Sequence, residues 1–139
     1  MLRKPSTLFV CTLSSLLLLT VSAAASAEEI SGYTGAQLFQ RFCASCHGKT
    51  GEGDGPVASS LKTMVPDLTR ISKRRGGQYP QELVRRIIDG TDVRSPHGSR
   101  DMPVWGQEFW QAQGADAKAR QETIQMIDRL VEYVGKIQR

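Results

Sequence analysis

Cys43-Ala44-Ser45-Cys46-His47 is the most informative segment of this chain. Two residues separate its thiols, and an imidazole follows the second thiol directly. This C-x-x-C-H pattern is the attachment signature of a c-type haem. Cys43 and Cys46 add to the two vinyl groups and fix the porphyrin to one turn of backbone, which places His47 beneath the iron as a ligand. The motif therefore predicts one covalently attached haem c per chain.

A redox-active dithiol and a zinc site are the two alternative interpretations of these residues. A thioredoxin-like dithiol needs a βαβ context, which the helical and Gly-rich flanking sequence does not provide. A zinc site built from Cys43, Cys46, His47 and His97 would need adjacent Cys46 and His47 to turn toward one tetrahedral metal, and the chain has no second C-x-x-C pair. Both interpretations have less support from the sequence than haem attachment.

The N-terminal residues have the pattern of a secretory signal. Arg3 and Lys4 form a positive region, an apolar stretch covers residues 8–21, and Ala25-Ser26-Ala27 is a cleavage site of the A-x-A type. The apolar stretch of about 14 residues is shorter than the roughly 20 that span a bilayer. We expect residues 1–27 to be a signal peptide, 28–139 to be the mature domain, and the protein to reach a bacterial periplasm without a transmembrane segment after cleavage.

Composition narrows the function further. Cleavage would remove Cys11 and leave two cysteines, which in an oxidising compartment need an explanation that haem attachment supplies. It would also remove two basic residues and no acidic ones, so the formal charge falls from +4 to +2. The chain has no basic run with interleaved aromatic residues, so we expect no nucleic-acid partner.

Three segments have helical patterns. Residues 34–43 begin at Thr34 with Gln37 three positions later, which predicts a capping box. Residues 80–89 start at a proline and stop before Gly90. Residues 116–136 carry an apolar stripe at three- and four-residue steps: Ile124, Ile127, Val131 and Val134. The connections are rich in Gly and Pro, and no alternating strand pattern occurs. We predict an all-α fold with three main helices and short helical turns around the haem.

The second axial ligand of the iron must come from a distant segment. Met102 is the best candidate because Pro103 stiffens its loop between helices. Met126 belongs to the last helix and is expected in the core, and Met64 is close to His47 in the chain. His97 remains the alternative, since imidazole binds iron well and lies in the same loop as Met102.

The order of these motifs resembles the class I cytochromes c of bacterial respiratory chains, from Gly35 to Tyr133. Gly35-x3-Phe39-x3-Cys43 is similar to the family's N-terminal helix, which the C-terminal helix crosses closely, here through Tyr133. Gly55-Pro56 looks like the glycine-proline pair whose carbonyl accepts the free ring N–H of the proximal histidine, and this resemblance assigns Pro56 to His47.

The resemblance also places Met102-Pro103 at the family's distal-ligand position, before the last helix. It implies an electron-transfer protein that cycles ferric and ferrous iron between redox partner proteins, without catalytic residues. The alternatives are a cytochrome c subunit of a specific periplasmic oxidoreductase complex and, with less support, a haem peroxidase that would use His97 as its acid-base residue. The donor and the acceptor are not specified by these motifs.

Overall fold

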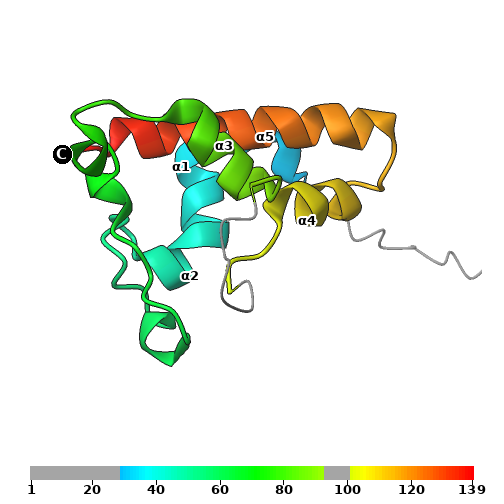
Figure 1. Cartoon of the computed structure of the whole chain (residues 1–139). Coiled ribbons are helices and arrows are strands. Elements are labelled where there is room, and N and C mark those ends of the chain that lie inside the picture. Colours follow the sequence, from blue (N-terminus) through cyan, green and yellow to red (C-terminus); the bar gives the residue numbers. More distant parts are fainter. Residues whose placement is uncertain (1–28, 93–100) are drawn as a thin grey trace, which may run out of the picture.

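A computed structural model of the chain describes residues 29–92 and 101–139. In this part of the chain the regular structure is helical, with five α-helices, short 3-10 turns and no strand. The predicted signal peptide (residues 1–27) and His97 lie outside the described residues, so those predictions stay untested. Figure 1 shows the long C-terminal helix α5 (Ala117–Lys136) with α1 (Gly35–Leu38), α3 (Gln81–Asp89) and α4 (Trp105–Ala112) packed against it. The all-α prediction is confirmed.

The predicted first helix is interrupted. Helix α1 (Gly35–Leu38) starts with the expected capping box: the Thr34 side chain accepts from the Gln37 backbone N–H, and the Gln37 side chain accepts from the Thr34 N–H at 2.9 Å. Residues Phe39–Cys43 then form a π-helical segment, and α2 (Ala44–His47) follows. Such π segments are frequent at functional sites, and this one leads directly into the two thiols.

Helix α1 crosses α5 at very short range, because Gly35 has no side chain. A Cβ atom at Gly35 would lie 2.1 Å from the backbone oxygen of Arg129. One turn later, Phe39 packs against Tyr133 with ring centroids 5.1 Å apart. The crossing predicted through Gly35, Phe39 and Tyr133 is confirmed.

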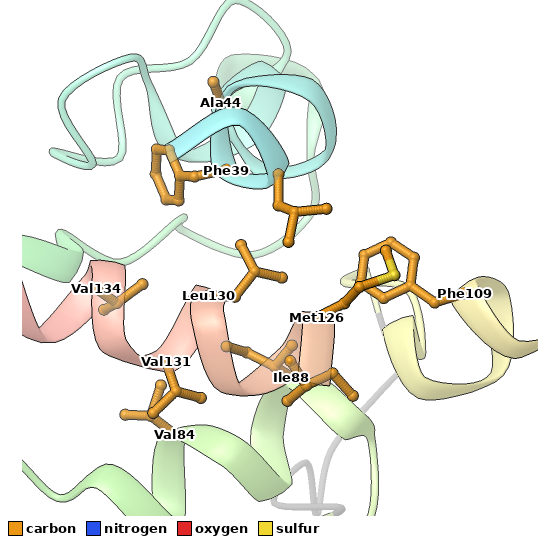
Figure 2. Close-up of a cluster of buried hydrophobic side chains, with 11 residues drawn as sticks. Phe39, Ala44, Val84, Ile88, Phe109, Met126, Leu130, Val131 and Val134 are labelled. Atoms are coloured by element: carbon orange, nitrogen blue, oxygen red, sulfur yellow. The ribbon is translucent and has the colours of Figure 1, made fainter. Parts of the chain in front are cut away.

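The core is built around one face of α5. Leu130 and Met126 are fully buried there, which confirms Met126 as a packing residue. Ile124, by contrast, is 45% exposed, so the expected apolar stripe was wrong at that position. Figure 2 shows Phe39 of the π-helical segment, Val84 and Ile88 of α3, and Phe109 of α4 around the buried side chains of α5. The cluster comprises Leu38, Phe39, Ala44, Val84, Ile88, Phe109, Met126, Ile127, Leu130, Val131 and Val134.

The second predicted helix is present as α3 (Gln81–Asp89), which Gly90 ends with a φ of 88°. An additional helix, α4 (Trp105–Ala112), was not predicted; its start falls inside the expected connection 91–106. Its large apolar residues Trp105, Phe109 and Trp110 span less than two helical turns, which is too short to reveal a helical period. Tertiary packing stabilises this helix, since Phe109 is 1% exposed against the core.

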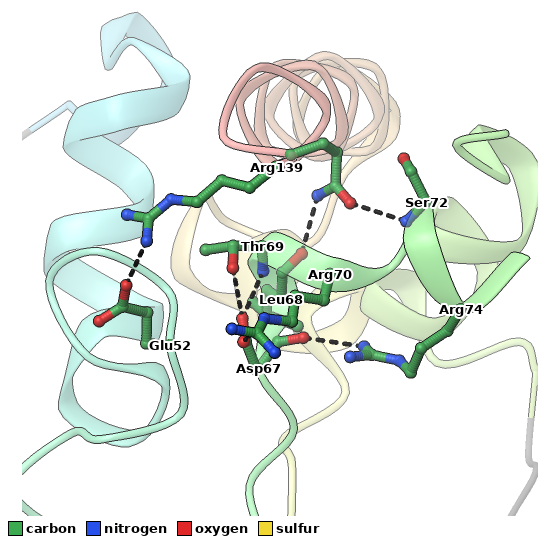
Figure 3. Close-up of polar contacts among 9 residues, drawn as sticks. Glu52, Asp67, Leu68, Thr69, Arg70, Ser72, Arg74 and Arg139 are labelled. Carbon is green, nitrogen blue, oxygen red and sulfur yellow. Dashed lines mark hydrogen bonds and ion pairs between the residues drawn. The ribbon is translucent and has the colours of Figure 1, made fainter. Parts of the chain in front are cut away.

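The C-terminal residues hydrogen-bond to the irregular segment that follows residue 66. Gln138 donates to the Leu68 carbonyl at 2.7 Å and accepts from the Ser72 N–H at 2.9 Å, and the Arg139 N–H donates to the Thr69 carbonyl at 2.8 Å. Arg74 donates to the Asp67 carbonyl at 2.8 Å (Figure 3). These bonds hold residues 67–75 against the end of α5. None of the helices in residues 29–92 and 101–139 has the length and apolar character to cross a bilayer.

Candidate functional site

The haem-attachment motif lies on α2 and the residue before it. Cys43 and Cys46 are free, half-buried thiols, and His47 is buried with 9% of its surface exposed. Cys43 ends the π-helical segment and α2 is a single helical turn, so the three side chains lie within five consecutive residues. The structure therefore brings together the three residues that the motif predicted.

The proximal histidine is oriented by Pro66. Its Nδ1 atom lies 3.4 Å from the Pro66 carbonyl oxygen, a long hydrogen bond. A carbonyl can only accept, so Nδ1 carries the proton and the lone pair of Nε2 is left for a metal. The expected partner, Pro56, was wrong.

The error at Pro56 has a structural reason. Gly55 packs against the backbone of α2: its N–H donates to the Cys46 carbonyl at 3.1 Å, and a Cβ there would lie 2.4 Å from the Ser45 oxygen. Pro56 itself is exposed. The chain returns to the imidazole ten residues later, in the sequence Pro66-Asp67, where Asp67 caps the next 3-10 turn. No short-range pattern in the sequence singles out Pro66, because its contact with His47 joins residues 19 positions apart.

Burial sets the protonation states of the motif. It lowers the pKa of His47, with the Pro66 hydrogen bond acting in the opposite direction, so the imidazole is the neutral, metal-binding form at neutral pH. Burial, with a smaller effect of Cys46, raises the pKa of the Cys43 thiol to about 12. The Cys43 side chain is therefore a neutral thiol at neutral pH.

A cavity in two adjoining parts of about 230 and 350 Å³ surrounds the motif. Both parts are lined by Cys43, His47, Pro66 and Met102. Together they have the size of a cofactor site, for which about 300–1,000 Å³ is usual. The inner part is walled mainly by apolar side chains: Phe39, Leu68, Ile71, Pro80, Leu83, Val84, Ile87, Ile88, Leu130 and Val134.

The cavity explains why two apolar residues of α3 are incompletely buried. Leu83 is half-buried and Ile87 is 39% exposed, although both are apolar residues of the predicted helix 80–89. Both line the inner part of the cavity, so a planar apolar group bound there would cover them. The lining also includes Arg74 and Arg75, two residues that sequence patterns did not single out as part of the site. Their cationic side chains suit the ionised propionates of a haem.

The three methionines of the described residues have different environments. Met126 is fully buried in the core, and Met64 is 94% exposed. Met102 is half-buried and lines both parts of the cavity with His47. The site therefore brings Met102 to the cavity, whereas Met126 contributes only to packing.

Comparison with known proteins identifies this architecture. The family model described as Cytochrome c matches residues 33–137, which is most of the chain. The chain belongs to the cytochrome c family. No curated protein and no solved structure matches it at a significant level.

As a cytochrome c, the chain binds a covalently attached haem c, and its residues fit that group. The two thiols have the required C-x-x-C-H spacing, the neutral histidine follows them, and the cavity beside them is apolar. A single cavity accommodates both the attachment motif and Met102. The family implies haem-based electron transfer, so this cytochrome c is an electron carrier rather than an enzyme.

Proposed function

We propose that this cytochrome c is a His/Met-ligated one-electron carrier of the bacterial periplasm, exchanging electrons with exported redox partner proteins. The observation that carries the proposal is that His47 and Met102 line the same cavity beside both thiols. When bound with both side chains as ligands, the haem supplies a ferric/ferrous couple and leaves no iron position open to oxygen or peroxide.

Each residue of the proposed site has its own task. The Pro66 carbonyl restrains the His47 ring and raises its basicity as a ligand, an effect that outer hydrogen bonds generally have on metal-bound histidines. The thioether of Met102 is a soft ligand that favours ferrous iron, and the apolar walls act in the same direction. We therefore expect a high reduction potential.

Voltammetry of the purified holoprotein tests this function. We expect one reversible one-electron wave, and we expect the ferrous protein not to bind carbon monoxide, because the distal position is closed. Rapid peroxide turnover by the reduced protein, or stoichiometric carbon monoxide binding, would instead support an open haem enzyme. Size-exclusion chromatography of a periplasmic extract distinguishes a free carrier from a subunit held in a larger oxidoreductase complex.

The export proposal predicts a specific mass. The protein recovered from the periplasm should begin at Glu28 and carry one haem that acidified organic solvent does not extract, because thioether bonds resist such extraction. Intact-mass spectrometry measures both properties at once. As a matched control, the Cys43→Ala/Cys46→Ala variant should release its haem, and a periplasmic protein that still contains residues 1–27 would contradict the cleavage site.

A further inference from the structure

Two irregular loops line the outer part of the cavity. One covers residues 61–66 and ends at Pro66, whose carbonyl lies against His47; the other covers residues 101–104 and contains Met102. Thr63 Oγ1 donates a hydrogen bond to Asp101 Oδ2, joining residues that are 38 positions apart. Within residues 29–92 and 101–139, no other hydrogen bond or ion pair joins these two loops.

We propose that the bond between Thr63 and Asp101 is a latch that holds the Met102 loop closed over the cavity. The latch connects the loop that orients the proximal histidine to the loop that supplies the distal thioether. It deepens the proposed function and rests on it, since the latch acts on iron ligation only if Met102 is a ligand. Thr63 and Asp101 are positioning residues, because neither is proposed to touch iron.

The position of Met102 between two anchors explains why a latch matters. On the C-terminal side, Trp105 begins α4 and packs against Phe42 and Phe109, at centroid distances of 5.5 and 5.4 Å. On the N-terminal side, Asp101 directly precedes Met102, and its bond to Thr63 is the anchor that the structure provides there. Residues 101–103 have no helix or strand hydrogen bonds, and the first hydrogen bonds of α4 begin at the Val104 carbonyl. Segments of this kind open locally at low cost.

The chemistry of the pair suits this task. The acceptor is a carboxylate, and hydrogen bonds to charged acceptors are stronger than those between neutral groups. Asp101 is half-buried and Thr63 is exposed, so the bond lies at the surface of the two loops. Thr63 is β-branched and has few side-chain rotamers, so its hydroxyl loses little entropy when it forms the bond.

Titration of the ferric holoprotein with imidazole measures the latch. Imidazole competes for the distal position, and its apparent affinity equals its intrinsic affinity multiplied by the fraction of molecules in which that position is open. Thr63→Val keeps the shape of the side chain and removes the donor. We expect it to raise the apparent affinity about fivefold to tenfold, the usual effect of losing one hydrogen bond at an exposed position. Thr63→Ser, the matched control, keeps the donor and should stay within about twofold of the wild type.

The double variant makes the test specific. Asp101→Ala alone should match the effect of Thr63→Val, and the two together should add little, because both remove the same bond. Equal imidazole affinity in Thr63→Val and wild type, or additive effects in the double variant, would overturn the latch. Thr63 is exposed, so these substitutions leave the core intact.

The sulfur-to-iron charge-transfer band separates this proposal from the proposed function. If the wild-type ferric protein has the band and Met102→Ala lacks it, the ligation holds and the imidazole titration judges the latch alone. If the wild type lacks the band, the ligation proposal fails and the latch falls with it.

Discussion

Replacement of Met102 by alanine is expected to open the iron of this cytochrome c. Met102 lines both parts of the cavity with His47, and alanine has no atom that could reach a metal from that wall. The ferric protein should lose its sulfur-to-iron charge-transfer band, and the ferrous protein should bind carbon monoxide stoichiometrically. The reduction potential should fall substantially, because axial ligands move haem potentials over a span of about 0.8 V. Absorption spectroscopy and voltammetry measure these changes.

Two variants serve as controls for this prediction. Met64→Ala changes a methionine that is 94% exposed and should preserve the charge-transfer band. His97→Ala should likewise preserve ligation, although His97 lies outside the residues that the structure describes. If His97→Ala opens the site and Met102→Ala does not, the distal ligand is the histidine and the expected high potential is wrong.

Replacement of Gly35 by alanine should destabilise the fold strongly. The added Cβ would lie 2.1 Å from the Arg129 backbone oxygen and 2.9 Å from the Tyr133 Cβ, so helices α1 and α5 must move apart. Overpacking of this kind costs about 1–3 kcal/mol or more, and we expect the free energy of unfolding to fall by about 3 kcal/mol. The loss should appear although alanine favours helices by about 1 kcal/mol over glycine. Denaturant titration of the holoprotein measures it.

Gly32→Ala is the matched control for the helix crossing. A Cβ at Gly32 would meet no atom within 4 Å, and this glycine precedes the crossing by three residues. The free energy of unfolding of Gly32→Ala should lie within about 0.5 kcal/mol of the wild-type value, as is usual for surface substitutions. A similar loss of stability in both variants would mean that local backbone effects, rather than the approach of α1 to α5, explain the result at Gly35.

Short-range sequence patterns were sufficient to predict the attachment motif and the local helix boundaries. The C-x-x-C-H motif is contained in one helical turn, so its chemistry can be recognised without knowledge of the rest of the fold. The capping box at Thr34 and the ends of α3 and α5 depend on hydrogen bonds within a few residues, and these were predicted closely. Hydrophobic periodicity gave the all-α class, because a long amphipathic helix repeats its pattern several times.

The contacts between distant residues at the site could not be predicted from the sequence and became visible in the tertiary structure. Pro66 rather than Pro56 reaches His47, because Gly55 packs on α2 and the intervening loop turns back before the carbonyl approaches the ring. The bond between Thr63 and Asp101 and the stability of α4 also depend on partners far away in the chain. Loops rich in Gly and Pro have no periodicity from which their path could be inferred. Their course is fixed by burial and by long-range hydrogen bonds, which exist only once the helices have packed.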